Sequence, residues 1–92
     1  MSIEVRVPTI LRSHTNQEKI VKGEGDTLAK LFDDLDTRYS GLKGRVVTDE
    51  GALHRFVNVY INDEDVRFIG GLEAKLSDGD SITILPAVAG GM

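Results

Sequence analysis

The chain has 92 residues, of which 40% are hydrophobic and 28% are charged, and its formal net charge is -4. This composition is typical of a small globular protein and excludes a disordered chain, while the lack of cysteine excludes disulfides and thiolate catalysis. The acidic balance argues against nucleic acid as a partner and favours a basic protein surface. No apolar run is long enough to cross a membrane, and "MSIEVRV" does not have the pattern of a secretion signal. We therefore expect a single cytoplasmic domain over residues 1–92.

The N-terminal part is predicted to form a hairpin of two strands. Hydrophobicity alternates in "IEVRVP", so Val5 faces one side of a strand and Arg6 faces the other, and Pro8 ends the strand. A turn signal follows around Thr15 and Asn16. The stretch "KIVKG" is therefore expected to return as the partner of the first strand.

A change of period predicts a helix within "GEGDTLAKLFDDLDTRYSG". Asp26 or Thr27 can cap its N-terminus, and Gly41 is placed to end it. The apolar residues recur at three- and four-residue steps, as on one face of a helix. They are Leu28, Leu31, Phe32, Leu35 and Tyr39.

The second half of the chain is predicted to complete the sheet. Residues 42–55 have no clear period and are expected to form a long loop with room for a short helical turn. The stretch "FVNVYIN" predicts a strand with Asn58 and Tyr60 on its outer face, "NDED" predicts a turn, and "VRF" predicts a short edge strand. "SITIL" predicts the last strand, with Ile82 and Ile84 facing inward. This order favours an α+β fold in which one main helix covers one face of a mixed sheet.

Motifs for metal or cofactor binding are weak in this sequence. His14 and His54 are forty residues apart with no cysteine near either, so we expect loop or surface histidines and no metal site. The stretch "GEGDTL" begins like a dinucleotide-binding fingerprint, but Leu28 occupies the place of the third glycine and Asp26 would repel a pyrophosphate. "NDED" is too short and isolated for a calcium loop.

Three carboxylates, Asp33, Asp34 and Asp36, lie close together on the predicted helix. A general acid–base pair needs an enclosing pocket, for which a domain of this size has little room. We therefore interpret these carboxylates as a solvated helix face. The sequence predicts no catalytic side chain, and we expect that the protein is not an enzyme.

The chain ends with the uncharged stretch "PAVAGGM". Proline cannot donate a hydrogen bond to a neighbouring strand, so pairing of the last strand is predicted to stop at Pro86, with a flexible tail over residues 86–92. The five residues after Pro86 can reach about 17 Å, at roughly 3.3–3.6 Å per residue. An apolar tail suits binding in a groove, with a narrow channel around the glycines; an end without function is the alternative. The predicted recognition residues are Pro86, Ala87, Val88, Ala89 and Gly90.

The outer face of the predicted sheet leads into this tail. If Ile82 and Ile84 face the helix, the side chains that alternate with them face outward. The predicted partner-docking surface comprises Arg6, Asn58, Tyr60, Thr83 and Leu85. Tyr60 and Leu85 would be its apolar anchors and Arg6 would set the orientation; scattered apolar side chains without a role are the alternative.

Several stretches together resemble ubiquitin-like sulfur carriers of the MoaD and ThiS family, and in particular the branch that serves a bacterial cysteine pathway. They are "VPTILRSHT", "GDTLAKLFDDL", "HRFVNVYINDEDVRF" and "LSDGDSITILPAVAGG". The resemblance implies a β-grasp fold. It also implies an activating enzyme of the MoeB or ThiF type, which consumes ATP to adenylate the C-terminal glycine carboxylate before sulfur displaces AMP. Gly91 would then carry the thiocarboxylate, and the protein itself would bind no cofactor.

The same resemblance implies two further partners and a processing step. In the cysteine branch, the thiocarboxylate attacks an aminoacrylate on a pyridoxal-phosphate cysteine synthase, and a zinc JAMM-type peptidase later releases cysteine. Met92 departs from the family pattern, because a mature carrier ends at the second glycine. We expect a precursor from which a peptidase removes Met92, and a monomer when the protein is free.

Three other functions stay open on the sequence. The protein could be a modifier that is joined through Gly91 to lysines of other proteins. It could donate sulfur for molybdopterin or thiamine synthesis. It could also be a plain β-grasp interaction module that is never activated.

Overall fold

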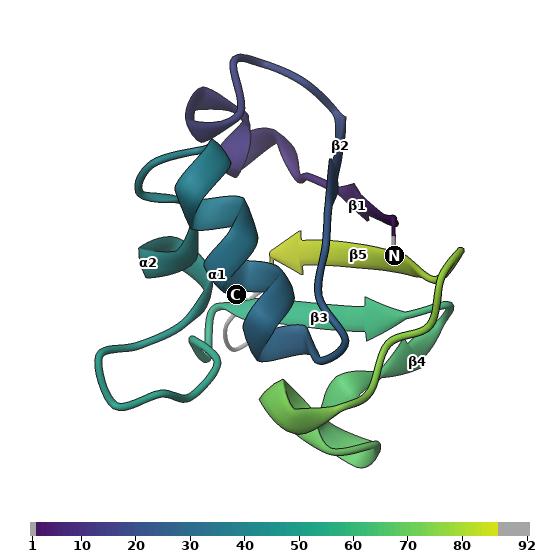
Figure 1. The fold of residues 1–92 in the computed structure, drawn as a ribbon. Helices are drawn as coiled ribbons and strands as arrows, with labels where there is room; N and C mark the ends of the chain where they lie inside the picture. Colours follow the sequence, from purple (N-terminus) through teal and green to yellow (C-terminus); the bar gives the residue numbers. More distant parts are fainter. Residues whose placement is uncertain (1, 87–92) are drawn as a thin grey trace.

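Five strands form the sheet of the protein in the computed structural model, which describes residues 2–86 (Figure 1). They are β1 Ile3–Arg6, β2 Ile20–Gly23, β3 Val57–Ile61, β4 Glu64–Asp65 and β5 Ser81–Pro86. Their order across the sheet is β2-β1-β5-β3-β4. β5 runs parallel to β1, whereas the pairs β1–β2, β3–β5 and β3–β4 are antiparallel. The predicted mixed sheet is confirmed.

Alternation of side chains gives the sheet one buried and one outer face. Val5 lies beside Ile82 in the parallel register of β1 and β5, and both side chains are fully buried. The next pair, Arg6 and Thr83, points to the opposite face because successive side chains of a strand alternate. The inward positions predicted from the sequence are therefore confirmed.

Helix α1, Leu28–Arg38, packs on the buried face of the sheet through its apolar stripe. The fully buried members of this stripe are Leu28, Leu31, Phe32 and Leu35. The Thr27 hydroxyl accepts a hydrogen bond from the backbone N–H of Lys30 at 3.3 Å. Of the two predicted caps, Thr27 is therefore the one that satisfies a free N–H of the first turn.

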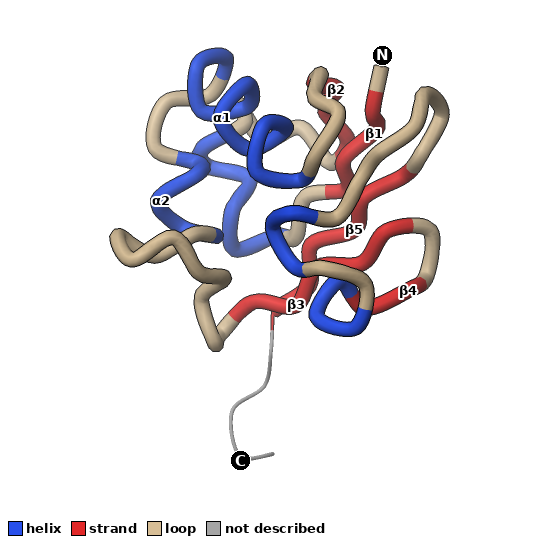
Figure 2. The backbone as a smooth tube through the Cα atoms, turned by 60° about the horizontal axis from the view of Figure 1, so that its bottom comes forward, coloured by secondary structure: helices blue, strands red, loops and turns tan. Residues whose placement is uncertain are grey.

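The segment predicted as a loop, residues 42–55, contains a second helix, α2 Leu42–Val46. Leu42 and Val46 are fully buried, so this segment contributes to the core. Figure 2 shows α1 and α2 on the same side of the sheet. This helix is the short helical turn for which the loop prediction left room, and at five residues it takes its stability from tertiary packing.

A carboxylate of α1 holds the start of α2. Asp36 Oδ1 accepts hydrogen bonds from the backbone N–H of Gly41 at 3.1 Å and of Lys43 at 3.3 Å. Gly41 has a φ of 91°, a left-handed conformation that glycine adopts without strain. The chain thus turns at the predicted glycine and continues into α2.

The predicted edge strand at "VRF" is wrong, because this stretch is a 3₁₀-helix, η2 Val66–Phe68. The Asp65 carboxylate accepts a hydrogen bond from the backbone N–H of Arg67 at 2.9 Å, and the Arg67 guanidinium binds the same carboxylate at 2.6 Å. These bonds turn the chain away from the sheet after β4. The connections hold two other 3₁₀-helices that were not predicted, η1 Thr9–His14 and η3 Gly71–Glu73.

Strand β5 extends one residue further than predicted, since Pro86 still lies opposite Val57 of β3. β1 pairs with β5 only as far as Thr83, so β5 has a neighbour on one side only at Pro86. A residue without an N–H is tolerated at such an edge position. The predicted tail beyond Pro86, and its predicted mobility, lie outside the described residues.

None of the helices in residues 2–86 has the length and apolar character needed to cross a membrane.

Candidate functional site

The outer face of the sheet brings all five predicted docking residues together. Thr83 lies between Arg6 of β1 and Tyr60 of β3 in the two strand registers. Leu85 lies opposite Asn58, two residues further along β5. The Leu85 side chain is 45% exposed, in contrast to the buried Ile82 and Ile84 on the other face. The predicted arrangement of these residues is confirmed, whereas their role in docking is a proposal.

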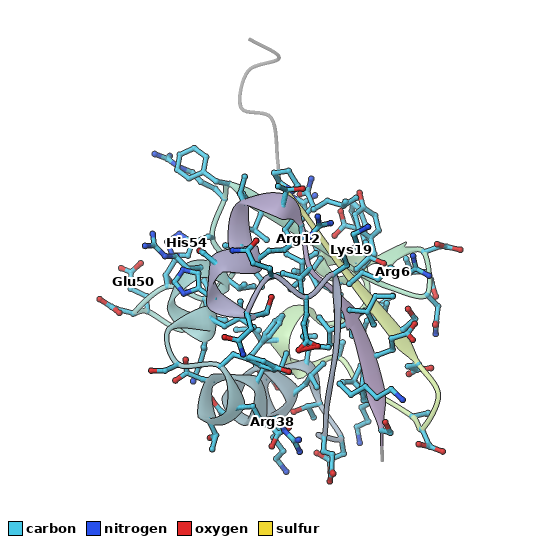
Figure 3. All side chains as sticks on the ribbon, turned by 90° about the horizontal axis from the view of Figure 1, so that it is seen from above. Arg6, Arg12, Lys19, Arg38, Glu50 and His54 are labelled. Carbon is cyan, nitrogen blue, oxygen red and sulfur yellow. The ribbon has the colours of Figure 1, made fainter. Side chains whose placement is uncertain are left out.

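A groove of about 380 Å³ runs beside the end of β5 on this face, and we name it the sheet groove. It is lined by Arg6, Val7, Pro8, Arg12, Lys19, Ile20, Thr83, Ile84 and Leu85. Figure 3 shows Arg6, Lys19 and Arg12 on one flank of the molecule. Arg12 Nε donates a hydrogen bond to the Val7 carbonyl at 3.1 Å, which fixes its guanidinium over the groove. The groove therefore combines apolar side chains with three cations.

Sequence reasoning missed Arg12, Lys19 and Ile20 as residues of this face. Ile20 lies opposite Arg6 in the hairpin register, so it could have been found from the pairing of the first two strands. Lys19 precedes β2, and its carbonyl accepts a hydrogen bond from the backbone N–H of the buried Val7, so alternation alone does not place it on the outer face. Arg12 comes from η1, whose residues show no periodic pattern of hydrophobicity. Its place in the groove follows only from the three-dimensional structure.

The two histidines, predicted to be loop or surface residues, line one hollow of about 500 Å³ that we name the histidine hollow. It lies beside the first residue of β3 and is lined by Ile10, Leu11, Ser13, His14, Gly44, Arg45, His54, Phe56 and Val57. His14 comes from η1, Arg45 comes from α2, and His54 precedes β3. The sequence did not indicate that they lie close together, because the two histidines are forty residues apart. Within residues 2–86, no group of three or more His, Asp or Glu side chains is close enough to hold a metal ion.

The three carboxylates of α1 hold the structure around the helix. Asp34 accepts hydrogen bonds from the backbone N–H of Glu24 and from Arg38, both at 2.8 Å. Burial raises the pKa of Asp34, but these two hydrogen bonds and the charge of Arg38 outweigh it, so the pKa lies below the usual range of aspartate. Asp33 forms an ion pair with Lys43 of α2. The prediction of a solvated helix face therefore left out one role of these carboxylates, which also link α1 to neighbouring segments.

Close packing explains the glycines of "GEGDTL". A Cβ atom at Gly25 would lie 2.5 Å from the backbone nitrogen of Leu31. The segment before α1 therefore approaches the helix backbone at a distance that only glycine allows. This supports the interpretation that the motif is not a dinucleotide-binding loop.

The residues on which the predicted terminal chemistry depends lie outside the described part of the chain. They are Ala87, Val88, Ala89, Gly90, Gly91 and Met92. Pro86 is the last described residue, and it is paired with Val57 at the end of the sheet. Gly91 follows five residues later, which is a reach of about 17 Å at most for an extended chain.

Comparison with known proteins gives a match over nearly the whole chain. Residues 5–91 match the model of the ThiS family. Sulfur carrier protein CysO of Mycobacterium tuberculosis (strain ATCC 25618 / H37Rv) is 56% identical over 93 aligned positions, which cover 99% of this chain and 100% of that protein. Small archaeal modifier protein 3 of Haloferax volcanii is 33% identical, again over 99% of this chain and 100% of that protein.

The solved structures agree with the β-grasp arrangement of the sheet and helix. A chain in the crystal structure of the Amycolatopsis orientalis BexX/CysO complex is 58% identical and superposes with a TM-score of 0.90. The match covers 97% of this chain and 99% of that chain. The expected β-grasp fold is therefore confirmed.

Proposed function

The chain belongs to the ThiS family, and from this premise we propose that it is a sulfur carrier protein for cysteine biosynthesis. Its C-terminal glycine carboxylate, at Gly91 once Met92 is removed, is adenylated by a partner enzyme and converted to a thiocarboxylate. The observation that carries this proposal is the full-length similarity to a protein named as a sulfur carrier, at 56% identity. The protein acts as a carrier and is not itself an enzyme.

The chemistry starts from a carboxylate, which is a poor acyl donor. A carboxylate oxygen of Gly91 attacks the α-phosphorus of ATP, and pyrophosphate leaves. Hydrosulfide then attacks the acyl carbon, and AMP leaves with that oxygen, so that one oxygen is replaced by sulfur. The thiocarboxylate is an ionised, soft nucleophile, like a thiolate. The activating enzyme supplies the ATP site, and the carrier supplies the terminus and a surface for docking.

The outer sheet face is the proposed docking surface for this MoeB- or ThiF-type enzyme. Tyr60 and Leu85 offer apolar contact area on this face, and the Arg6 guanidinium beside Thr83 supplies charge and direction. The face ends at Pro86, where the chain leaves the sheet. An enzyme that binds here is therefore within reach of Gly91.

Two further partners follow from the cysteine pathway. A pyridoxal-phosphate cysteine synthase would present the aminoacrylate that the thiocarboxylate attacks, and a zinc JAMM-type peptidase would release cysteine from the carrier. The same peptidase is our candidate for the removal of Met92. We propose that the carrier works in the cytoplasm as a monomer when it is free of these enzymes.

A protein modifier joined to lysines is the second candidate function. It is supported by the relative named small archaeal modifier protein 3, at 33% identity. Activation at Gly91 is common to both functions, and only the acceptor differs.

The test of activation compares two forms of the protein, one ending at Met92 and one ending at Gly91. Each is incubated with the cognate activating enzyme, ATP and sulfide, and its intact mass is measured. We expect the mass to rise by the difference between sulfur and oxygen only in the form that ends at Gly91. The methionine side chain would keep its carboxylate from the in-line approach to ATP that adenylation requires.

The peptidase provides the control for this test. A zinc-loaded JAMM peptidase should make the longer form competent, and a chelator should block that rescue. Equal modification of both forms would show that Met92 does not protect the terminus. If neither form gains sulfur, the chain is an interaction module and the carrier function is wrong.

A further inference from the structure

We propose that the histidine hollow is a second docking site, which takes an acidic segment of a partner protein with an apolar side chain flanked by carboxylates. The proposal rests on the proposed function in one respect, namely that the partner is an enzyme that handles the C-terminus. The hollow lies at the end of the sheet where β5 ends, on the other side of η1 from the sheet groove.

The apolar part of the hollow has a buried floor and an exposed rim. Leu11 and Val57 form the floor and are 5% and 8% exposed. Ile10 and Phe56 form the rim and are 63% and 53% exposed. A partner side chain placed between Ile10 and Phe56 would remove both from water, which favours an aliphatic or aromatic occupant.

Among the described residues, the lining of the hollow contains the cation Arg45 and no carboxylate, although the protein as a whole is acidic. In the part of the chain from residue 2 to residue 86, the ion pairs use four cations: Lys30, Arg38, Lys43 and Arg67. Arg45 in the lining and Arg55 at the rim therefore have no carboxylate of residues 2–86 within 4.0 Å. Cations that the fold leaves without carboxylates are complementary to an acidic partner.

Arg55 is also placed by an aromatic contact. Its guanidinium carbon lies 5.3 Å from the centre of the Phe56 ring, within the range of a cation–π interaction. This contact holds a positive charge at the apolar rim. A carboxylate next to an inserted apolar side chain would meet that charge.

The imidazoles define the two sides of the site. The His14 ring lies next to Gly41, and a Cβ atom added at Gly41 would be 3.4 Å from His14 Nδ1. Because glycine has no side chain, residue 41 does not cover the ring. His54 also borders a second depression lined by Asp49 and Glu50, and Figure 3 shows Glu50 on the same flank as His54. Those carboxylates repel an acidic segment. The segment should therefore lie toward Arg45 and η1.

A matched pair of double variants tests the site. Arg45→Glu with Phe56→Ser removes one cation and one exposed aromatic ring from the hollow. Lys75→Glu with Phe68→Ser makes the same change of charge and the same phenylalanine-to-serine change at two exposed positions outside its lining. All forms end at Gly91, and their affinities for the cognate activating enzyme are measured by calorimetry after thermal unfolding confirms that they fold.

We expect the hollow variant to lose about tenfold or more in affinity and the control variant to stay within about twofold of the parent. Thiocarboxylation at saturating enzyme should persist in the control variant, because its two positions line neither the hollow nor the sheet groove. Equal affinity of the two variants, whether both are weakened or neither is, would overturn the proposal.

A peptide titration separates this proposal from the carrier function. The probe is a short peptide with a leucine between pairs of glutamates, and lysines replace the glutamates in its control. Amide resonances of Ser13, Gly44 and Arg45 should shift with the acidic peptide and not with the basic one. No localised shift, or an equal response to inorganic phosphate, would contradict the proposal. If the enzyme binds no form of the protein, the activation step fails for that enzyme and this titration alone decides the hollow.

Discussion

Pro86, the last residue of β5, lies opposite Val57, the first residue of β3. Leu85 precedes Pro86 and lines the sheet groove, whereas Val57 lines the histidine hollow together with Phe56. The chain therefore leaves the sheet next to both surfaces. A partner that receives the terminus can contact either side of this exit, which links the docking residues to the chemistry proposed at Gly91.

Leu85 should be a principal contact for the activating enzyme. Leu85→Glu places a charge on the outer face next to Pro86, and we expect the affinity for the enzyme to fall by about tenfold or more, with a further loss when Tyr60→Glu is added. Leu85 is 45% exposed, so the variant should keep its fold. Calorimetric titration gives the affinity, and Phe68→Glu, at an apolar position that is 85% exposed, is the control. Unchanged affinity in a folded double variant would remove this face as the docking surface.

The strands and their faces were predictable because hydrophobic and polar residues alternate along even short strands. The alternating stretches around Val5 and Val59 have buried and outer positions that differ sharply in polarity, and burial in the structure follows them. The hairpin register could have added Ile20 to the outer face. The strand faces therefore followed from local sequence alone.

The elements whose type or bounds the sequence did not reveal are those set by tertiary contacts. α2 has five residues, too few for a periodic signal, and it depends on the buried Leu42 and on the Asp36 carboxylate of α1. The stretch "VRF" has the composition of a strand, but the Asp65–Arg67 bonds make it a 3₁₀-helix. The histidine hollow joins side chains from three segments, so no motif could indicate it.

Replacement of Gly25 should destabilise the fold strongly. The Cβ of Gly25→Ala would lie 2.5 Å from the Leu31 backbone nitrogen, and backbone cannot yield as a flexible side chain can. We expect the free energy of unfolding to fall by about 1–3 kcal/mol, as it does when extra atoms are forced into other well-packed sites. Gly44→Ala is the matched control, because its Cβ meets no atom within 4 Å and it lies within α2. The free energy of unfolding of that control should rise by about 0.5–1 kcal/mol. Chemical denaturation measures both variants. A Gly25→Ala variant as stable as the parent would contradict the structure.

The cap of α1 gives a second stability prediction. Thr27→Ala removes the hydroxyl that accepts the Lys30 N–H bond, and we expect the free energy of unfolding to fall by about 0.5–2 kcal/mol. Thr37→Ala changes a threonine inside the same helix, where alanine is the better helix former, and should be neutral or stabilising. Urea unfolding of both variants makes the comparison. A loss at Thr37 as large as that at Thr27 would show that capping is not the cause.

Acid should weaken the turn after β4. Hydrogen bonds from the Arg67 side chain, and then from its backbone N–H, hold the pKa of Asp65 below its usual range. A carboxylate with a depressed folded-state pKa stabilises the fold above its unfolded pKa of about 3.9, and this contribution is lost as pH falls through the folded value. The stability gap between the parent and Asp65→Asn should therefore be widest above about pH 5 and close toward pH 2. Denaturation curves across this range test it, with the exposed Glu64→Gln as control; a gap that stays constant with pH would contradict the assignment.

The central claim is that sulfur held at Gly91 becomes the sulfur of cysteine. The most direct measurement loads the form that ends at Gly91 with a heavy sulfur isotope through the activating enzyme and ATP. The purified carrier is then mixed with the pyridoxal-phosphate cysteine synthase, activated serine and unlabelled sulfide, and the protein mass and the cysteine released by the JAMM peptidase are determined. We expect a carrier adduct that is heavier than the unloaded Gly91 form by one cysteine residue, followed by release of cysteine that contains the heavy isotope. Cysteine that contains only the unlabelled sulfur, with no adduct on the carrier, would contradict it.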